Sequence, residues 1–175
     1  TLVVATYFIS TTTHSRLLLA YWCVIACAQG GSLVTYLIGH RVTHQVPAAG
    51  RVLCLVPVFN EPRQVLRETV DSLLAQTVPV DIIVIDDGST TPVEPCVDHP
   101  RVRWMWQANA GKRAAQTAAL RSVDPQDYAF ILTVDSDSQP FPDACEQMLR
   151  AFQDPEVWAV TGIIYVRNHR ESFLS

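Results

Sequence analysis

The sequence lacks the motifs of two common kinds of nucleotide site. No G-x-G-x-x-G pattern follows an apolar strand-like run, so a dinucleotide site of that type is not supported. The Gly111-Lys112 pair does not belong to an ATPase phosphate loop. Such a loop needs an earlier glycine where this chain has Trp106, and Ser or Thr where it has Arg113. Both motif classes are therefore excluded.

Charge is also scarce, and the cysteines do not form a metal-binding pattern. A net charge of −4 over 175 residues gives no global case for nucleic-acid binding, so no nucleic-acid partner is expected. The five cysteines form an odd set without zinc-ligand spacing. We expect all five to be reduced and mostly structural, which fits a cytosolic domain. The length allows one domain with a real core, but not two full ones.

Charged residues are missing altogether from residues 17–39, a stretch flanked by Arg16 and Arg41. A helix needs roughly 20 apolar residues to cross a bilayer core. Aromatic residues lie towards both ends of this stretch, where interfacial aromatics belong. The sequence therefore predicts a transmembrane helix over residues 15–41. A buried hairpin and a signal peptide are the alternatives, although signal cores are shorter than this stretch.

The flanking segments follow from that prediction. Residues 1–14 are expected to be the tail of a preceding membrane span. Residues 42–51 contain a proline and a glycine without periodicity, and are expected to be a linker. Arg41 and Arg51 favour a cytoplasmic location for the domain that follows, over residues 52–175.

From residue 52 onwards, short apolar runs alternate with helical patterns. The apolar runs are typical of buried parallel strands, whereas Leu66, Val70 and Leu73 recur at helical spacing. This alternation predicts an α/β fold with a doubly wound, Rossmann-like parallel sheet. Strands are expected over residues 52–56, 81–85, 102–106, 129–134 and 157–166, and helices over residues 66–74, 109–120 and 143–152.

The fourth expected strand ends in two carboxylates, Asp135 and Asp137. In an open α/β sheet, ligands collect at the carboxyl ends of the strands, and a strand would point both side chains to one side. Two hard oxygen donors without an adjacent Lys or Arg suit a divalent cation that keeps room for phosphate oxygens. A plain turn and the nucleophile motif of a haloacid-dehalogenase-like phosphatase are the alternatives. Pro140 excludes a calcium loop, which needs a glycine there.

Polar residues suited to a nucleotide follow other strands. Asp86 and Asp87 could accept hydrogen bonds from a base or a ribose, or could form an ordinary turn. Lys112 and Arg113 lie at an expected helix start, where backbone N–H groups favour anions. They suit a diphosphate, or form a solvated basic turn. Phe59, just past the first strand, could stack on a base or belong to the core.

Four segments taken in order, residues 56–61, 85–89, 109–116 and 134–137, form a pattern that resembles the processive, membrane-embedded family-2 glycosyltransferases. The resemblance covers residues 52–175. It is strongest to the hyaluronan synthase group, and chitin synthases and chitooligosaccharide synthases share much of it. It implies a truncated nucleotide-sugar-binding domain of the GT-A type, cytoplasmic and attached to the plasma membrane. Its partners would be a UDP-sugar donor, a growing polysaccharide acceptor and the lipid bilayer.

The resemblance also implies which residues hold the nucleoside. Pro57 and Phe59 would line the uracil pocket, with support from Glu61. Asp87, together with Asp86, would contact the base or the ribose. These five residues are therefore the expected nucleoside-binding set.

At the other end of the donor, the resemblance places charged residues. Lys112 and Arg113 would lie by the nucleotide diphosphate. Asp135 would face the nucleotide sugar, and Asp137 would bind Mg²⁺ or Mn²⁺ bridging the phosphates. Asp135 and Asp137 are thus the expected catalytic and metal-binding pair.

Family members transfer sugar with inversion, which requires a separate carboxylate as general base. The resemblance places that base and the pore-forming helices beyond Ser175, because none of Asp143, Glu146 or Glu156 matches the base motif. We expect this piece to bind donor and metal without polymerising sugar alone. The full enzyme would use UDP-GlcNAc and UDP-GlcA. A chitin-type synthase using UDP-GlcNAc only, and an inactive membrane-anchored nucleotide-sugar binder, are the alternatives.

Overall fold

The computed structural model describes residues 16–38 and 46–163, and the chain divides into two compact units near residue 42. In the first unit, helix α2 (Arg16–Ile38) covers most of the segment predicted to cross a membrane. Within the described ranges, however, no helix combines the length and the apolar character that a bilayer crossing requires. The membrane-span tail expected at residues 1–14 lies outside the described residues.

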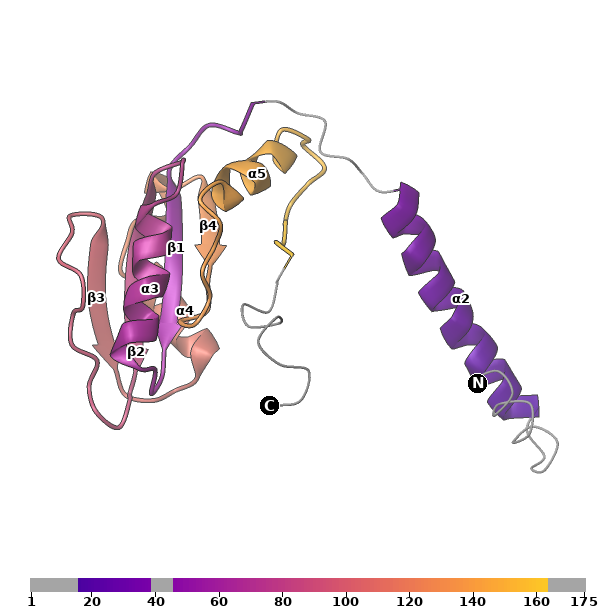
Figure 1. The fold of residues 1–175 in the computed structure, drawn as a ribbon, viewed down its shortest axis with the longest axis horizontal. Helices are drawn as coiled ribbons and strands as arrows, with labels where there is room; N and C mark the ends of the chain where they lie inside the picture. Colours follow the sequence, from indigo (N-terminus) through magenta and orange to yellow (C-terminus); the bar gives the residue numbers. More distant parts are fainter. Residues whose placement is uncertain (1–15, 39–45, 164–175) are drawn as a thin grey trace. The chain divides into compact units, whose positions relative to one another are not determined.

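A parallel sheet forms the centre of the second unit (Figure 1). All three pairs of neighbouring strands are parallel, so the predicted α/β fold with a parallel sheet is confirmed. The strands lie in the spatial order β3-β2-β1-β4. Their bounds are β1 (Val52–Val58), β2 (Val80–Asp87), β3 (Val102–Gln107) and β4 (Phe130–Thr133).

The order of the strands reverses at one place. From β1 the chain moves outward through β2 to β3, and then places β4 on the other side of β1. In open α/β sheets, ligands bind outside the carboxyl ends of the strands at such a switch point. The edge where β1 and β4 end is therefore where the fold favours a ligand site.

Helices cover both faces of the sheet (Figure 1). On one face, Leu66, Val70 and Leu73 of α3 are fully buried against the strands because their spacing forms one apolar stripe. On the other face, α4 buries Ala115 and Ala119, whose small side chains let the helix lie close to the sheet. The three predicted helices are confirmed with adjusted ends. They are α3 (Arg63–Leu74), α4 (Lys112–Arg121) and α5 (Ala144–Ala151), and a short 3₁₀ turn, η1 (Pro125–Asp127), precedes β4.

Strand β1 is buried along its whole length, as expected of a central strand covered on both faces. Its even-numbered residues face α3 and α5, whereas Leu53 and Leu55 face α4. Pro57 is tolerated here because β4 pairs with β1 only as far as Leu55. The missing N–H of Pro57 therefore lies past the end of the neighbouring ladder.

Three of the five cysteines have the structural role that the sequence predicts, whereas Cys23 and Cys27 are exposed on α2. All five are free thiols, and Cys54, Cys96 and Cys145 are buried in the domain. Burial raises the pKa of these three thiols, because a thiolate would lose its hydration there. They pack as small apolar side chains.

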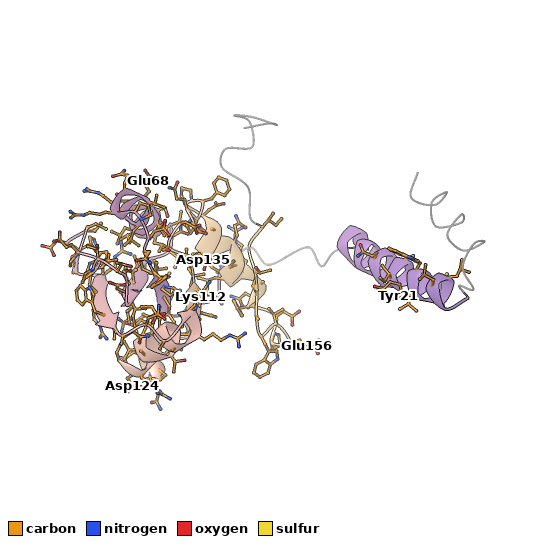
Figure 2. All side chains as sticks on the ribbon, turned by 90° about the horizontal axis from the view of Figure 1, so that it is seen from below. Tyr21, Glu68, Lys112, Asp124, Asp135 and Glu156 are labelled. Carbon is orange, nitrogen blue, oxygen red and sulfur yellow. The ribbon has the colours of Figure 1, made fainter. Side chains whose placement is uncertain are left out.

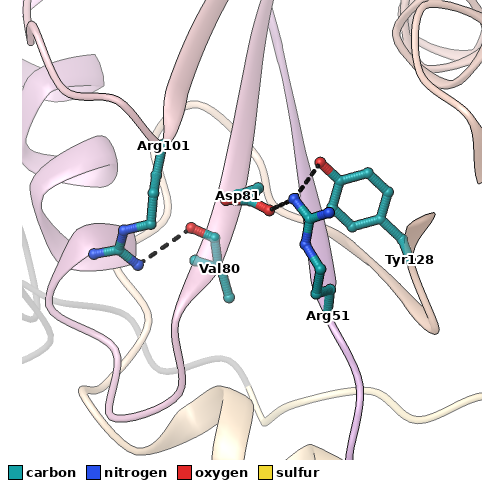
Figure 3. A network of polar contacts seen from close by, with 5 residues as sticks. All are labelled: Arg51, Val80, Asp81, Arg101 and Tyr128. Carbon is teal, nitrogen blue, oxygen red and sulfur yellow. Dashed lines mark hydrogen bonds and ion pairs between the residues drawn. The ribbon is translucent and has the colours of Figure 1, made fainter.

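Polar contacts close the amino-terminal edge of the sheet (Figure 3). Arg51 Nη2 donates to Asp81 Oδ2 at 2.8 Å and to Tyr128 Oη at 3.4 Å, and the guanidinium carbon lies 4.7 Å from the centre of the Tyr128 ring. Arg101 Nη1 donates to the Val80 carbonyl at 3.3 Å. These contacts tie the starts of β1 and β2 to the loops around them. They lie at the edge opposite the ends of the strands.

The strand predicted over residues 157–166 is wrong in its described part. Residues 157–163 form no strand, and Trp158 and Ile163 are 90% and 75% exposed. Their apolar character suits a sheet, but a strand also has to share backbone hydrogen bonds with a neighbouring strand. Residues 157–163 pair with none of the described strands, so β4 is an edge of the described sheet. Residues 164–166 lie outside the described ranges.

Candidate functional site

The candidate site lies at the carboxyl edge of the sheet, on both sides of the switch point. The loop after β4, residues 134–138, carries the two predicted metal ligands and is called the acidic loop. Glu61, from the loop after β1, accepts a hydrogen bond from Ser136 Oγ at 3.0 Å. Lys112, the first residue of α4, forms an ion pair with Asp135. Two other segments of the chain, the loop after β1 and the start of α4, therefore contact the acidic loop.

The acidic loop is a tight turn that begins at the sheet. The Val134 N–H still donates to the Leu55 carbonyl of β1 at 3.1 Å, and the Ser138 N–H donates to the Asp135 carbonyl at 3.1 Å. The second bond closes a four-residue turn. Asp135 and Asp137 are both exposed, while Ser136 between them is half-buried. The loop thus presents two carboxylates to solvent.

Lys112 and Asp135 lie close together at this edge (Figure 2). Their side chains are 57% and 59% exposed, so water screens the pair and its contribution to stability is small. Arg113 is exposed on the same first turn of α4. An anion at the start of α4 would meet the Lys112 cation and the positive end of the helix dipole together.

Asp87 organises the loop that leads into α4. It is buried, and its carboxylate accepts hydrogen bonds from Gln107 Nε2 at 2.6 Å, the Ala110 N–H at 3.0 Å and the Gly111 N–H at 2.7 Å. Burial alone would raise the pKa of Asp87, but these three hydrogen bonds outweigh it and the pKa is lowered. Asp87 therefore fixes the approach to Lys112. Its contact with a base or ribose stays a prediction.

Asp86 has a different set of partners, because successive residues of a strand point to opposite faces. Its carboxylate accepts from the Ser89 N–H and the Val93 N–H, each at 2.9 Å. It is buried as well. The Asp86 side chain therefore shapes the loop after β2, on the face opposite Asp87.

The loop after β1 is fixed through Asn60. This residue has a positive φ of 54°, a conformation that Asn adopts more readily than most residues. Its N–H donates to Ser89 Oγ and its Oδ1 accepts from the Thr90 N–H, both at 2.8 Å. Phe59 beside it is 52% exposed, so part of its side chain is accessible to a ligand. Pro57 is buried within β1.

The donor set of the acidic loop suits a hard divalent cation, but does not complete a site alone. Among residues 16–38 and 46–163, no group of three or more His, Cys, Asp or Glu side chains could hold a metal ion. Two carboxylates leave coordination positions for water and phosphate oxygens, which is how Mg²⁺ is commonly bound beside a nucleotide. A cation at Asp135 would replace the Lys112 ammonium there.

Two surface hollows lie on the domain away from the acidic loop, and the first of them borders Gln107. One, of about 540 Å³, runs along α4, and the other, of about 160 Å³, lies beside β4 and α5. Both have mainly apolar walls, and no carboxylate lines either of them. The charged edge of the sheet is therefore the better candidate site. The first hollow is lined by Gln107, Ala114, Thr117, Ala118, Arg121 and Ser122.

Three residues of the site were not singled out by the sequence reasoning. Ser136 and Gln107 are ordinary polar residues in a loop and at a strand end, and carry no distinguishing signal. Thr69 is fully buried on the apolar stripe of α3 and donates to the Ser136 carbonyl at 2.8 Å. A polar residue on a buried helix face needs a hydrogen-bond partner, so its position on the stripe was a usable signal.

The fold and the site together define the class. A parallel sheet with a switch point, an acidic loop and a basic helix start make an α/β domain suited to a charged ligand at its carboxyl edge. Residues 54–174 match the model of glycosyl transferase family 2. The chain belongs to this family, and the resemblance seen in the sequence is confirmed.

Relatives agree with this assignment. Hyaluronan synthase from Streptococcus pyogenes is 36% identical over 137 residues, covering 71% of this chain and 32% of that protein. An N-acetylglucosaminyltransferase from Azorhizobium caulinodans is 34% identical over 139 residues, covering 74% of this chain and 34% of that protein. One from Bradyrhizobium elkanii is 35% identical over 130 residues, covering 69% and 70%. The chain spans about a third of the length of the first two.

A solved structure supports the fold. A mannosyltransferase from Pyrobaculum calidifontis, in complex with GDP-Man and Mn²⁺, is similar with a TM-score of 0.55 and 23% identity, over 77% of this chain and 44% of that one. With the family match, this similarity confirms that the parallel sheet belongs to the GT-A glycosyltransferase fold.

Proposed function

We propose that this chain is the donor-binding part of a family-2 glycosyltransferase that adds sugars to a growing β-linked polysaccharide with inversion, using UDP-GlcNAc and UDP-GlcA. The observation that carries the proposal is the meeting of Lys112 with the acidic loop at the β1/β4 switch point. A nucleotide diphosphate would use cations together with a metal ion, and this edge of the sheet carries Lys112 and the two carboxylates of the acidic loop. The similarity to hyaluronan synthase supports the two donors.

The donor would lie across the carboxyl edge of the sheet. The exposed Phe59 ring would stack on the uracil above Pro57, beside the loops that Asp86 and Asp87 shape. Lys112 and Arg113 would contact the diphosphate. Asp135 and Asp137 would hold Mg²⁺ or Mn²⁺, and such an ion stabilises a leaving diphosphate as a Lewis acid. The general base is proposed to belong to a part of the enzyme outside this chain.

A second candidate has a specific observation in its favour. Two of the relatives are N-acetylglucosaminyltransferases, with identities of 34% and 35%. A chitin-type enzyme that uses UDP-GlcNAc alone would have the same uracil and diphosphate contacts. The two candidates differ only in how they treat the sugar of the donor.

We also propose that the enzyme is held in the plasma membrane with this domain in the cytoplasm. The uncharged stretch over residues 17–39, which includes most of α2, supports the proposal. Its test is the recovery of the chain after an alkaline carbonate wash of membranes. A membrane-anchored chain stays in the pellet, and a chain released into the wash contradicts the anchor.

Titration calorimetry tests the donor site. UDP, UDP-GlcNAc, UDP-GlcA and uridine are titrated into the detergent-solubilised chain, with Mn²⁺ and then with EDTA. Metal-dependent binding of UDP and of both sugar nucleotides is the expected result. Binding of UDP-GlcNAc without UDP-GlcA favours the chitin-type candidate. A folded chain that binds none of them contradicts the proposal.

A further inference from the structure

We infer that Glu61 is a positioning residue for the acidic loop, and that it acts through Ser136 on the two aspartates that flank this serine. This assignment rests on the proposed donor site and deepens it. It differs from the role that the sequence resemblance implied, in which Glu61 supports the uracil pocket. The two roles affect different parts of the donor, so they can be separated by experiment.

The first observation is the direction of Ser136. Its hydroxyl donates to Glu61 Oε2 at 3.0 Å, and its carbonyl accepts from the Thr69 hydroxyl at 2.8 Å. Both contacts pull the middle of the acidic loop towards α3. Asp135 and Asp137, one residue to either side, remain exposed. The serine therefore anchors the loop while its neighbours stay available for a cation.

The anchor continues along α3. Gln139 Nε2 donates to Glu68 Oε2 at 2.7 Å. Past the end of the helix, Gln76 Nε2 donates to the Phe141 carbonyl at 2.8 Å and Gln76 Oε1 accepts from the Cys145 N–H at 3.0 Å. The segment after the acidic loop is thus held by α3 and by Gln76 just past its end. Unlike the contact from the buried Thr69, the Glu61 contact reaches a side chain that can be changed without touching the core.

Glu61 also joins the two strands of the switch point. It follows β1, whereas Ser136 follows β4, and α3 begins two residues after Glu61. A change at Glu61 therefore alters the spacing between the acidic loop and the β1 loop. Ligands that must be held within a fraction of an ångström depend on such supporting contacts.

A double-mutant cycle tests the contact. Glu61→Ala, Ser136→Ala and the double variant are titrated with UDP in Mn²⁺, and with uridine. Each single variant is expected to weaken Mn²⁺-dependent UDP binding about 3- to 10-fold, and the double variant no further, because contacting residues are not additive. Uridine affinity stays within about twofold.

Glu61→Gln keeps an oxygen acceptor for the serine and is expected to retain most of the UDP affinity. Glu94→Ala, in an exposed residue of the loop after β2, is the matched control.

Several outcomes overturn the inference. A parallel loss of UDP and uridine affinity in Glu61→Ala would assign Glu61 to the base pocket. Additive effects, or a Glu61→Gln variant as weak as Glu61→Ala, would show that the Ser136 contact is not responsible. If the wild-type chain binds no UDP, the proposed function fails and the inference is decided by amide hydrogen exchange instead. Glu61→Ala should then speed exchange in residues 135–139 and leave residues 107–111 unchanged, and unchanged exchange in 135–139 refutes it.

Discussion

The Lys112 ammonium and the Asp135 carboxylate form an ion pair that joins the start of α4 to the acidic loop after β4. A bound diphosphate would need the Lys112 cation, and a bound metal ion would need the Asp135 carboxylate. In the absence of both ligands, the two side chains neutralise each other. Binding of the diphosphate would draw Lys112 away, and the freed Asp135 could then take a metal ion. The pair therefore links the two halves of the proposed site.

Replacing Lys112 should weaken the binding of the diphosphate without changing the binding of the nucleoside. Lys112→Met is expected to weaken UDP binding by about 10- to 100-fold, since a hydrogen bond to a charged group contributes about 1.5–3 kcal/mol. Uridine, which lacks phosphates, should bind as before. Titration calorimetry of both ligands measures the difference. Arg121→Met, at the far end of the same helix, is the control, and equal losses for UDP and uridine would remove the diphosphate role.

Asp137 is the second predicted metal ligand. Asp137→Asn keeps the size of the side chain but removes its charge, so Mn²⁺ should no longer strengthen UDP binding. The measurement is the ratio of UDP affinities in Mn²⁺ and in EDTA. The ratio should fall to near one in this variant and stay unchanged in Asp98→Asn, an exposed aspartate in the loop between β2 and β3. A wild-type ratio in Asp137→Asn would contradict the metal assignment.

Much of the fold could be predicted from local patterns. Apolar runs mark β1 and β2, because buried parallel strands need apolar side chains on both faces. Strand β4 carries a similar apolar run, although it lies at the edge of the described sheet and is partly exposed. The segment over residues 157–166 has a similar pattern, yet its described part forms no strand. Strand formation there depends on a hydrogen-bonding neighbour, which the residues themselves do not specify.

The candidate site was predictable in its residue types but not in its contacts. Asp86 and Asp87 are neighbours in sequence, and the sequence predicts the same contact with a base or a ribose for both. In the structure they point to opposite faces and hold different loops, one through Ser89 and the other through Gly111. Hydrogen bonds between residues more than 20 positions apart, as between Asp87 and Gly111, follow from tertiary packing and leave no local signature.

The hydrogen bonds of Asp87 make stability depend on pH. Its lowered pKa means that the folded state favours the carboxylate. The stabilisation is fully present above the ordinary value of 3.8 and is lost as pH falls through the lowered pKa. Asp87→Asn should cost about 1–3 kcal/mol at pH 7, because a buried donor loses its partner. Denaturant unfolding of both proteins between pH 7 and pH 3 measures this. The difference in the free energy of unfolding between the two proteins should become smaller at acid pH. A difference that does not change with pH would contradict the role of the Asp87 charge.

A substitution at Gly88 tests how closely the loop after β2 approaches the loop after β3. It has a φ of +74°, and a Cβ added there would lie 2.5 Å from the Asn109 backbone nitrogen. Gly88→Ala should therefore destabilise the domain by more than the roughly 1–2 kcal/mol of a left-handed conformation alone, because backbone must move to relieve the overlap. The displaced loop leads through Gly111 to Lys112, so UDP affinity should fall as well.

Gly162→Ala, where an added Cβ meets no atom within 4 Å, is the matched control. Thermal unfolding and UDP titration of both variants decide the matter. If Gly88→Ala is as stable as Gly162→Ala, the two loops do not pack this closely. If it is less stable but binds UDP normally, the position of Lys112 does not depend on the contact between Gly88 and Asn109.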